Sequence, residues 1–129
     1  MANLELINPK SAPKPVGPYS TAVVLNNGFL FLSGQIAIDP KTGEMKGENV
    51  KEQAEVIFLN ILNILNELGY KKEDIFKCVV YLKKMSDFKD MNSVYESFFE
   101  GHKPVRTTVE VSNLPKDALV EIEISAYKG

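Results

Sequence analysis

Arg106 is the only arginine in a chain that carries fourteen lysines. A guanidinium group binds a carboxylate through two parallel hydrogen bonds, and the point charge of a lysine does not offer this geometry. The first candidate for chemistry is therefore an anchor for a small anionic substrate. The alternative is an ion pair on the surface of a sheet, which contributes little to stability. The pattern of residues favours neither reading over the other.

Glu121 is the carboxylate that strand alternation places beside Arg106. Residues 105–111 and 119–127 read as strands, and their short connection predicts that they pair antiparallel. The residues assigned to the buried face are Val105, Thr107, Val109 and Val111 from one strand and Val120, Ile122, Ile124 and Ala126 from the other. Matching these two sets leaves Arg106, Thr108 and Glu121 together on the opposite face.

Other chemistries are limited by the residue inventory. One histidine, His102, and one cysteine, Cys78, cannot supply the three or four N and S ligands of a zinc site. His102 follows a predicted helix end, where a histidine usually meets terminal carbonyls, and Cys78 lies in an apolar stretch typical of a buried small residue. No Gly-rich phosphate loop and no GxSxG motif is present. We expect no metal and no cofactor.

The totals describe one globular domain over residues 1–129. A formal net charge of −2 argues against nucleic acid as a partner, because nonspecific binding of nucleic acid depends on clustered positive charge. No signal peptide is recognisable at the start, and no apolar run is long enough to cross a membrane. Together with the lone cysteine, these features predict a cytoplasmic location.

Periodicity and turn residues predict six strands and two helices. Asn49 and Gly69 suit the two ends of the longer helix, with Glu52 completing a capping box, and Asn26-Asn27-Gly28 predicts a hairpin turn. Four prolines make residues 9–18 an extended loop, with a polyproline ligand as the alternative. The expected strands are 4–7, 20–25, 29–36, 75–83, 105–111 and 119–127, and the expected helices are 50–68 and 87–100. This order indicates an α+β fold with both helices on one face of the sheet.

Several segments resemble the RidA family, also called YjgF, over essentially the whole chain. The strongest segment is Arg106-Thr107-Thr108-Val109-Glu110-Val111, followed by Leu114-Pro115-Lys116-Asp117 and Val120-Glu121-Ile122-Glu123. The supporting segments are Gly17-Pro18-Tyr19, Ser33-Gly34-Gln35-Ile36 with Asp39-Pro40-Lys41-Thr42-Gly43, and Asn92 to Phe99. Because these segments occur in order, the chain is identified as a member of the family.

The resemblance implies a chorismate-mutase-like α+β fold with a mixed sheet of about six strands, assembled as a homotrimer with pockets between subunits. It implies hydrolysis of 2-imino acids, such as 2-iminopropanoate derived from 2-aminoacrylate, to 2-keto acids and ammonia, without cofactor or metal. Arg106 would bind the substrate carboxylate, with help from the backbone N–H of Thr108, where many relatives carry cysteine. Glu121 would handle water and protons, while Tyr19, Ser33 and Gly34 would line the pocket.

Other readings of the same residues remain open. Tyr19 is also suited to packing the Pro-rich loop, and Ser33 to ending a strand. A trimer that binds a small carboxylate without converting it is one alternative function, and an endoribonuclease or translation inhibitor is another. Neither the preferred imino acid nor the pathway follows from the sequence.

Overall fold

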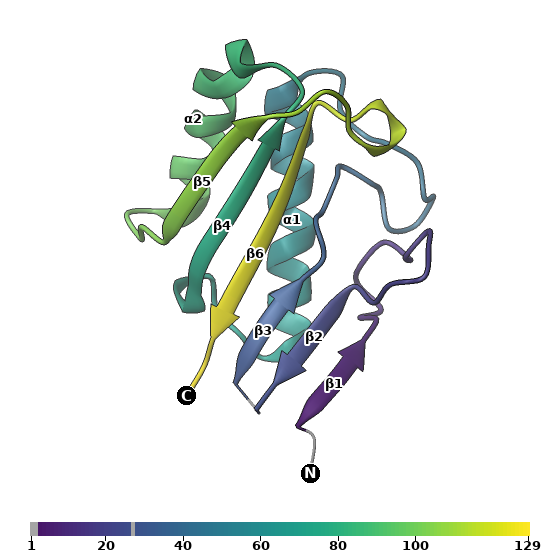
Figure 1. The fold of residues 1–129 in the computed structure, drawn as a ribbon, viewed down its shortest axis with the longest axis vertical. Helices are drawn as coiled ribbons and strands as arrows, with labels where there is room; N and C mark the ends of the chain where they lie inside the picture. The colour runs from purple at the N-terminus through teal and green to yellow at the C-terminus, as the bar shows by residue number, and fades with distance from the viewer. Residues whose placement is uncertain (1–2, 27) are drawn as a thin grey trace.

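A computed structural model of the chain describes residues 3–26 and 28–129 as a six-stranded sheet with both helices on one face (Figure 1). The strands are β1 (Leu4–Ile7), β2 (Ala22–Leu25), β3 (Phe29–Leu32), β4 (Ile75–Leu82), β5 (Val105–Glu110) and β6 (Val120–Tyr127), and the helices are α1 (Val50–Leu68) and α2 (Phe88–Phe99). The predicted α+β class and the two helices on one face are confirmed. Neither of these helices is long and apolar enough to cross a membrane, within the part of the chain that the structure describes.

The strand order is β1-β2-β3-β6-β4-β5, so β4 lies between β5 and β6 (Figure 1). The predicted pairing of β5 with β6 is wrong. β5 pairs parallel with β4, and β6 pairs antiparallel with both β4 and β3. The connection between β5 and β6 crosses the end of β4, where Val111 N–H donates to Leu82 O at 2.9 Å and Lys83 N–H to Leu119 O at 3.0 Å. A span of two strand spacings is about 10 Å, which this connection easily covers.

This order changes the face on which Arg106 lies. Residues directly opposed on paired strands share a face, and Cys78 of β4 opposes both Arg106 and Ile124. Arg106 therefore points to the same side as the buried Ile124, toward the helices. Glu121 opposes Tyr81 and lies on the other side of the sheet. The predicted shared face of Arg106 and Glu121 is wrong.

The same alternation corrects the predicted buried face of β5. Val105 and Val109 are 66% and 38% exposed, because they lie on the side of the sheet that no helix covers among the described residues. On β6 the prediction is confirmed. Its buried apolar residues are Val120, Ile122, Ile124 and Ala126.

Helix α1 begins and ends where its capping residues predict. The Asn49 side chain accepts a hydrogen bond from Glu52 N–H at 2.9 Å, and Gly69 ends the helix with a left-handed φ of 83°. The Glu52 carboxylate accepts from Glu48 N–H at 2.8 Å, so the second half of the predicted capping box is displaced by one residue. Local signals set both ends of this helix.

Strand β3 ends at Leu32, before the predicted boundary at residue 36. Gln35 then forms an isolated bridge with Ile122 of β6, with backbone N–H to O distances of 2.8 and 3.0 Å in the two directions. The chain leaves the sheet at Ser33 and Gly34 and touches it again at Gln35. Asn27, the central residue of the hairpin turn predicted at Asn26-Asn27-Gly28, lies outside the described residues.

Asn60 ties the loop that follows β3 to the core. This residue is 3% exposed on α1, and its Nδ2 donates to the backbone oxygen of Ile38 at 2.8 Å. A buried carbonyl without a hydrogen-bond partner costs free energy. This bond therefore satisfies the Ile38 carbonyl and also fixes the path of the loop.

We expect Asn60→Ala to lower the free energy of unfolding by about 1–3 kcal/mol, because it leaves the Ile38 carbonyl without its partner. Chemical denaturation of the purified protein measures this change. Asn63→Ala is the matched control, since Asn63 is an exposed asparagine on the same helix. Equal losses in the two variants would contradict the role assigned to the bond.

Candidate active site

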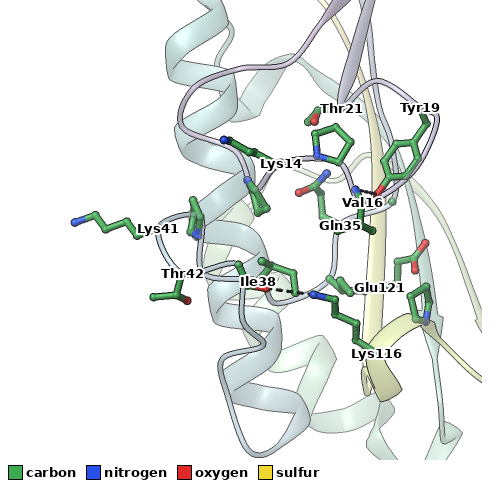
Figure 2. Close-up of a pocket in the computed structure, with 17 residues that line it drawn as sticks. Lys14, Val16, Tyr19, Thr21, Gln35, Ile38, Lys41, Thr42, Lys116 and Glu121 are labelled. Carbon is green, nitrogen blue, oxygen red and sulfur yellow. Dashed lines mark hydrogen bonds between the residues drawn. The ribbon is translucent and has the colours of Figure 1, made fainter.

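A pocket of about 480 Å³ opens between three loops and the start of β6 (Figure 2). The Pro-rich loop supplies Pro13 to Tyr19, the segment after β3 supplies Gly34 to Gly43, and the turn before β6 supplies Pro115 and Lys116. Figure 2 shows Tyr19 and Glu121 on one side of the pocket and Lys41 and Thr42 on the other. Prolines in all three loops restrict their backbones, so the pocket walls are preformed.

Gly34 lies directly against the carboxyl group of Glu121. A Cβ atom built on Gly34 would stand 2.1 Å from Glu121 Oε2, closer than any real contact. The absence of a side chain at Gly34 thus allows the close approach of Glu121. Any larger residue at position 34 would displace this carboxyl group.

The environment of Glu121 favours its protonated form. Partial burial raises the pKa of the Glu121 carboxyl group, and the nearby charge of Glu123 raises it further. A carboxyl group that holds its proton nearer to neutral pH is suited to general acid–base chemistry. Glu121 is therefore the carboxyl group of the pocket whose surroundings suit proton transfer.

Tyr19 and Ser33 differ in their relation to the pocket. Tyr19 lines it, is 50% exposed, and accepts a long hydrogen bond from Val16 N–H at 3.5 Å. The Ser33 hydroxyl donates to Ser20 O at 2.7 Å and does not line the pocket. The structure thus uses the Ser33 side chain to join the end of β3 to the Pro-rich loop.

Arg106 is held in place by helix α2. Its Nη1 donates to Asn92 Oδ1 at 2.7 Å, and its Cζ lies 4.6 Å from the ring centroid of Tyr95 and 5.4 Å from that of Phe88. An amide acceptor and two aromatic faces orient the guanidinium group without neutralising it. Arg106 therefore remains available to bind an anion.

Thr108 lies two residues further along β5, on the same side as Arg106. Its Oγ1 is buried and has no hydrogen-bond partner among the described residues. β5 is the last strand in the sheet order, so one of its backbone edges is unpaired within the described sheet. The candidate anchor residues lie at this open edge, and the pocket lies on the other side of β4.

Cys78 and His102 have structural roles, as the sequence indicates. Cys78 is fully buried, and burial raises the pKa of its thiol to about 11, which keeps it from acting as a thiolate nucleophile. His102 Nε2 lies 2.7 Å from Ile75 O, a strand carbonyl in place of the predicted helix terminus. Over residues 3–26 and 28–129, no three acidic, histidine or cysteine side chains form a group that could hold a metal ion.

Three lysines of the pocket are missed by the sequence analysis: Lys14, Lys41 and Lys116. Lysines in Pro-rich and turn segments usually extend into solvent, so their type and spacing give no signal. For Lys116 the sequence offers one indication of a functional role, which is its position in the Leu114 to Asp117 segment that resembles the family.

The geometry defines a class: a small α+β domain with a pocket between loops, a half-buried carboxyl group in the pocket wall, and an arginine on the edge strand of the sheet. The family model described as Endoribonuclease L-PSP matches residues 9–128. A RutC family protein from Pyrococcus horikoshii is 52% identical over 124 residues, which are 96% of this chain and 98% of that protein. The chain belongs to this family, the RidA or YjgF family.

Solved structures agree in fold. A protein of the conserved Rid family from Yersinia pestis has a TM-score of 0.92 and 39% identity, with 97% of this chain and 99% of that chain covered. The TdcF protein of E. coli, solved with bound serine, has a TM-score of 0.89 and 36% identity, with the same coverage.

We expect Glu121→Gln to be more thermally stable than the wild type at pH 7. Because the pKa of Glu121 is raised in the folded state, its stabilising contribution is present at low pH and is lost as pH rises through that raised value. The gain should shrink as pH falls toward about 4, where carboxyl groups are protonated in both states. Thermal melting at a series of pH values measures the difference.

Glu67→Gln is the control of opposite sign. Hydrogen bonds from Ser11 and Lys10 lower the pKa of Glu67. The ionised Glu67 carboxylate therefore stabilises the folded state at neutral pH, and this stabilisation is lost in acid. Glu67→Gln should therefore lower the melting temperature at pH 7. A similar loss in Glu121→Gln would contradict the assigned environment of Glu121.

Proposed function

We propose that this protein is a deaminase that hydrolyses reactive 2-imino acids to 2-keto acids and ammonia. The observation that carries the proposal is the Glu121 carboxyl group, with its raised pKa, set against Gly34 in the wall of a preformed pocket. The family membership and the serine bound by TdcF of E. coli support a ligand of amino-acid size.

The reaction needs little beyond a positioned proton carrier. Water adds through its oxygen to the carbon of a protonated C=N bond, and the lost proton passes to Glu121, directly or through another water. The tetrahedral intermediate then takes that proton from Glu121 on its nitrogen, ammonia leaves with the C–N electron pair, and the C=O bond forms as the hydroxyl proton passes to the departing ammonia. Glu121 accepts the first proton and returns it, so it ends in its starting state.

In this proposal Arg106 binds the substrate carboxylate, and the backbone N–H of Thr108 lies beside it. Within one chain Arg106 and Glu121 lie on opposite faces of the sheet with β4 between their strands, so they cannot meet on one small substrate. We therefore propose that Arg106 at the edge of one subunit completes the pocket of its neighbour in a homotrimer.

The uncovered face of the sheet supports association. Besides Phe76 at the irregular start of β4, seven large apolar side chains on the strands are 37% to 67% exposed: Leu4, Leu6, Phe29, Phe31, Val105, Val109 and Tyr127. The strand registers put all of them on the side opposite Arg106. Several large exposed apolar side chains on one face of a sheet are typical of an interface.

Two alternatives predict different results. A binding trimer that does not convert its ligand would bind a 2-keto acid with no rate enhancement. A ribonuclease is favoured only by the description of the family model, and the net charge of −2 and the single arginine provide little attraction for RNA. We propose that the protein acts in the cytoplasm, where reactive imines arise and its lone thiol stays reduced.

We expect the wild type to accelerate loss of 2-iminopropanoate generated in the assay by an amino-acid oxidase. Arg106→Ala should lower kcat/KM by roughly tenfold to a hundredfold, because a charge-assisted bidentate contact is lost. Arg106→Lys should recover only part of the lost kcat/KM, since one ammonium group cannot form the two parallel hydrogen bonds of a guanidinium group. The carboxylate anchor would be wrong if Arg106→Ala were as active as the wild type.

We expect the purified protein to have about three times the 14.4 kDa mass of one chain by light scattering. Phe31→Glu places a charge on the uncovered sheet face and should give a folded monomer without imine hydrolysis. Leu59→Glu is the control, because Leu59 is 59% exposed on α1, away from this face. An active monomer would overturn the shared site.

A further inference from the structure

The turn before β6 holds an unusual backbone. Four residues other than glycine have a positive φ in the described chain, and two of these, Asn26 and Glu100, lie in the link after β2 and at the end of α2. The other two are adjacent: Lys116 at 53° and Asp117 at 57°. Residues with a Cβ atom avoid this region, and such strain persists mostly where the surrounding structure fixes it for a function.

Neighbouring contacts hold this strained turn in place. The Asp117 carboxylate forms an ion pair with Lys83, which follows β4. Ala118 N–H donates to Pro115 O at 3.1 Å, and Ala118 is fully buried. The turn is therefore closed by a backbone hydrogen bond around Lys116 and tied to the end of β4 through Asp117.

The strained turn directs Lys116 across the pocket. Its Nζ donates to Gly43 O on the far loop at 3.2 Å (Figure 2). This bond uses one of the three ammonium hydrogens, and the two ion pairs found among the described residues do not include Lys116. The remaining donors of Lys116 are free to bind an anion in the pocket.

The charges that line the pocket exceed what a monocarboxylate needs. Three lysines, Lys14, Lys41 and Lys116, line the pocket with one acidic residue, Glu121. Lys116 is the lysine that reaches across it, whereas Lys14 and Lys41 point away from Glu121 in Figure 2. In the proposed function, the carboxylate next to the imine is bound by Arg106, which does not line this pocket within one chain. Lys116, which reaches across the pocket, is thus left without an anion to bind within one chain.

We infer that Lys116 binds a second acidic group of the substrate, so that the preferred substrates are dicarboxylic 2-imino acids derived from acidic amino acids. This inference rests on the proposed function and specifies its substrate class. The volume of 480 Å³ is many times the ~30 Å³ of a water molecule, which leaves room for a chain of several carbons.

Calorimetric binding of two stable keto acids tests this inference without requiring turnover. The probes are 2-oxoglutarate and 2-oxopentanoate, which have the same number of carbons and differ in the second carboxylate. We expect the wild type to bind the diacid roughly tenfold more tightly, as one charge-assisted contact implies. Equal affinities, or no binding of the diacid at millimolar concentration, would overturn the inference.

Substitutions assign the preference to Lys116. Lys116→Met should remove it by weakening the diacid alone, whereas Lys116→Arg should keep it. Lys46→Met is the matched control, because Lys46 is an exposed lysine near the same loop that does not line the pocket. A preference that survives Lys116→Met would show that another residue binds the second carboxylate, and would overturn the assignment.

Lys116→Gly separates binding from folding. Glycine adopts a positive φ without a Cβ clash, so this variant should melt no lower than the wild type while losing the diacid preference. A diacid preference retained in this variant would count against Lys116.

The outcomes also separate this inference from the proposed function. If the diacid preference holds but no imine is hydrolysed, the proposed deaminase function fails alone. Hydrolysis of monocarboxylic imines without any diacid preference would defeat only the inference about substrate class.

Discussion

The alternation of side chains across one sheet determines the rest of this structure. Each strand sends successive residues to opposite faces, one covered by α1 and α2 and the other left bare. Because β4 separates β5 from β6, Arg106 and Glu121 fall on different faces and at different places along the sheet. A chain with this topology keeps the Glu121 carboxyl group and the Arg106 guanidinium group apart, so the proposed reaction requires association to bring them to one ligand.

The sheet also explains why the pocket is rigid. Gln35 returns to β6 through two backbone hydrogen bonds, Asn60 holds Ile38 from the helix side, and the Lys83–Asp117 pair fixes the turn before β6. The loops around the pocket are thus tied to the core on both sides. A ligand enters a site whose walls are already ordered, which limits the entropy lost on binding.

Local signals in the sequence predicted local structure well. Asn49 and Gly69 set the ends of α1 because capping involves only neighbouring residues, and the family resemblance located Gly34 and Glu121 in one pocket. The pairing of β5 with β6 was predicted wrongly, because alternation gives a strand its two faces but not its neighbours. The backbone at Lys116 had no signal at all, since a positive φ is read from sequence mainly through glycine.

The bare apolar face of the sheet has a consequence for the behaviour of the protein in dilute solution. When copies of the chain cover this face, folding and assembly are linked by mass action, and the melting temperature rises with protein concentration. A newly made chain, with no partner yet, carries seven large exposed apolar side chains on this face. The time that such a chain spends alone is then the period in which it is most exposed to aggregation and proteolysis.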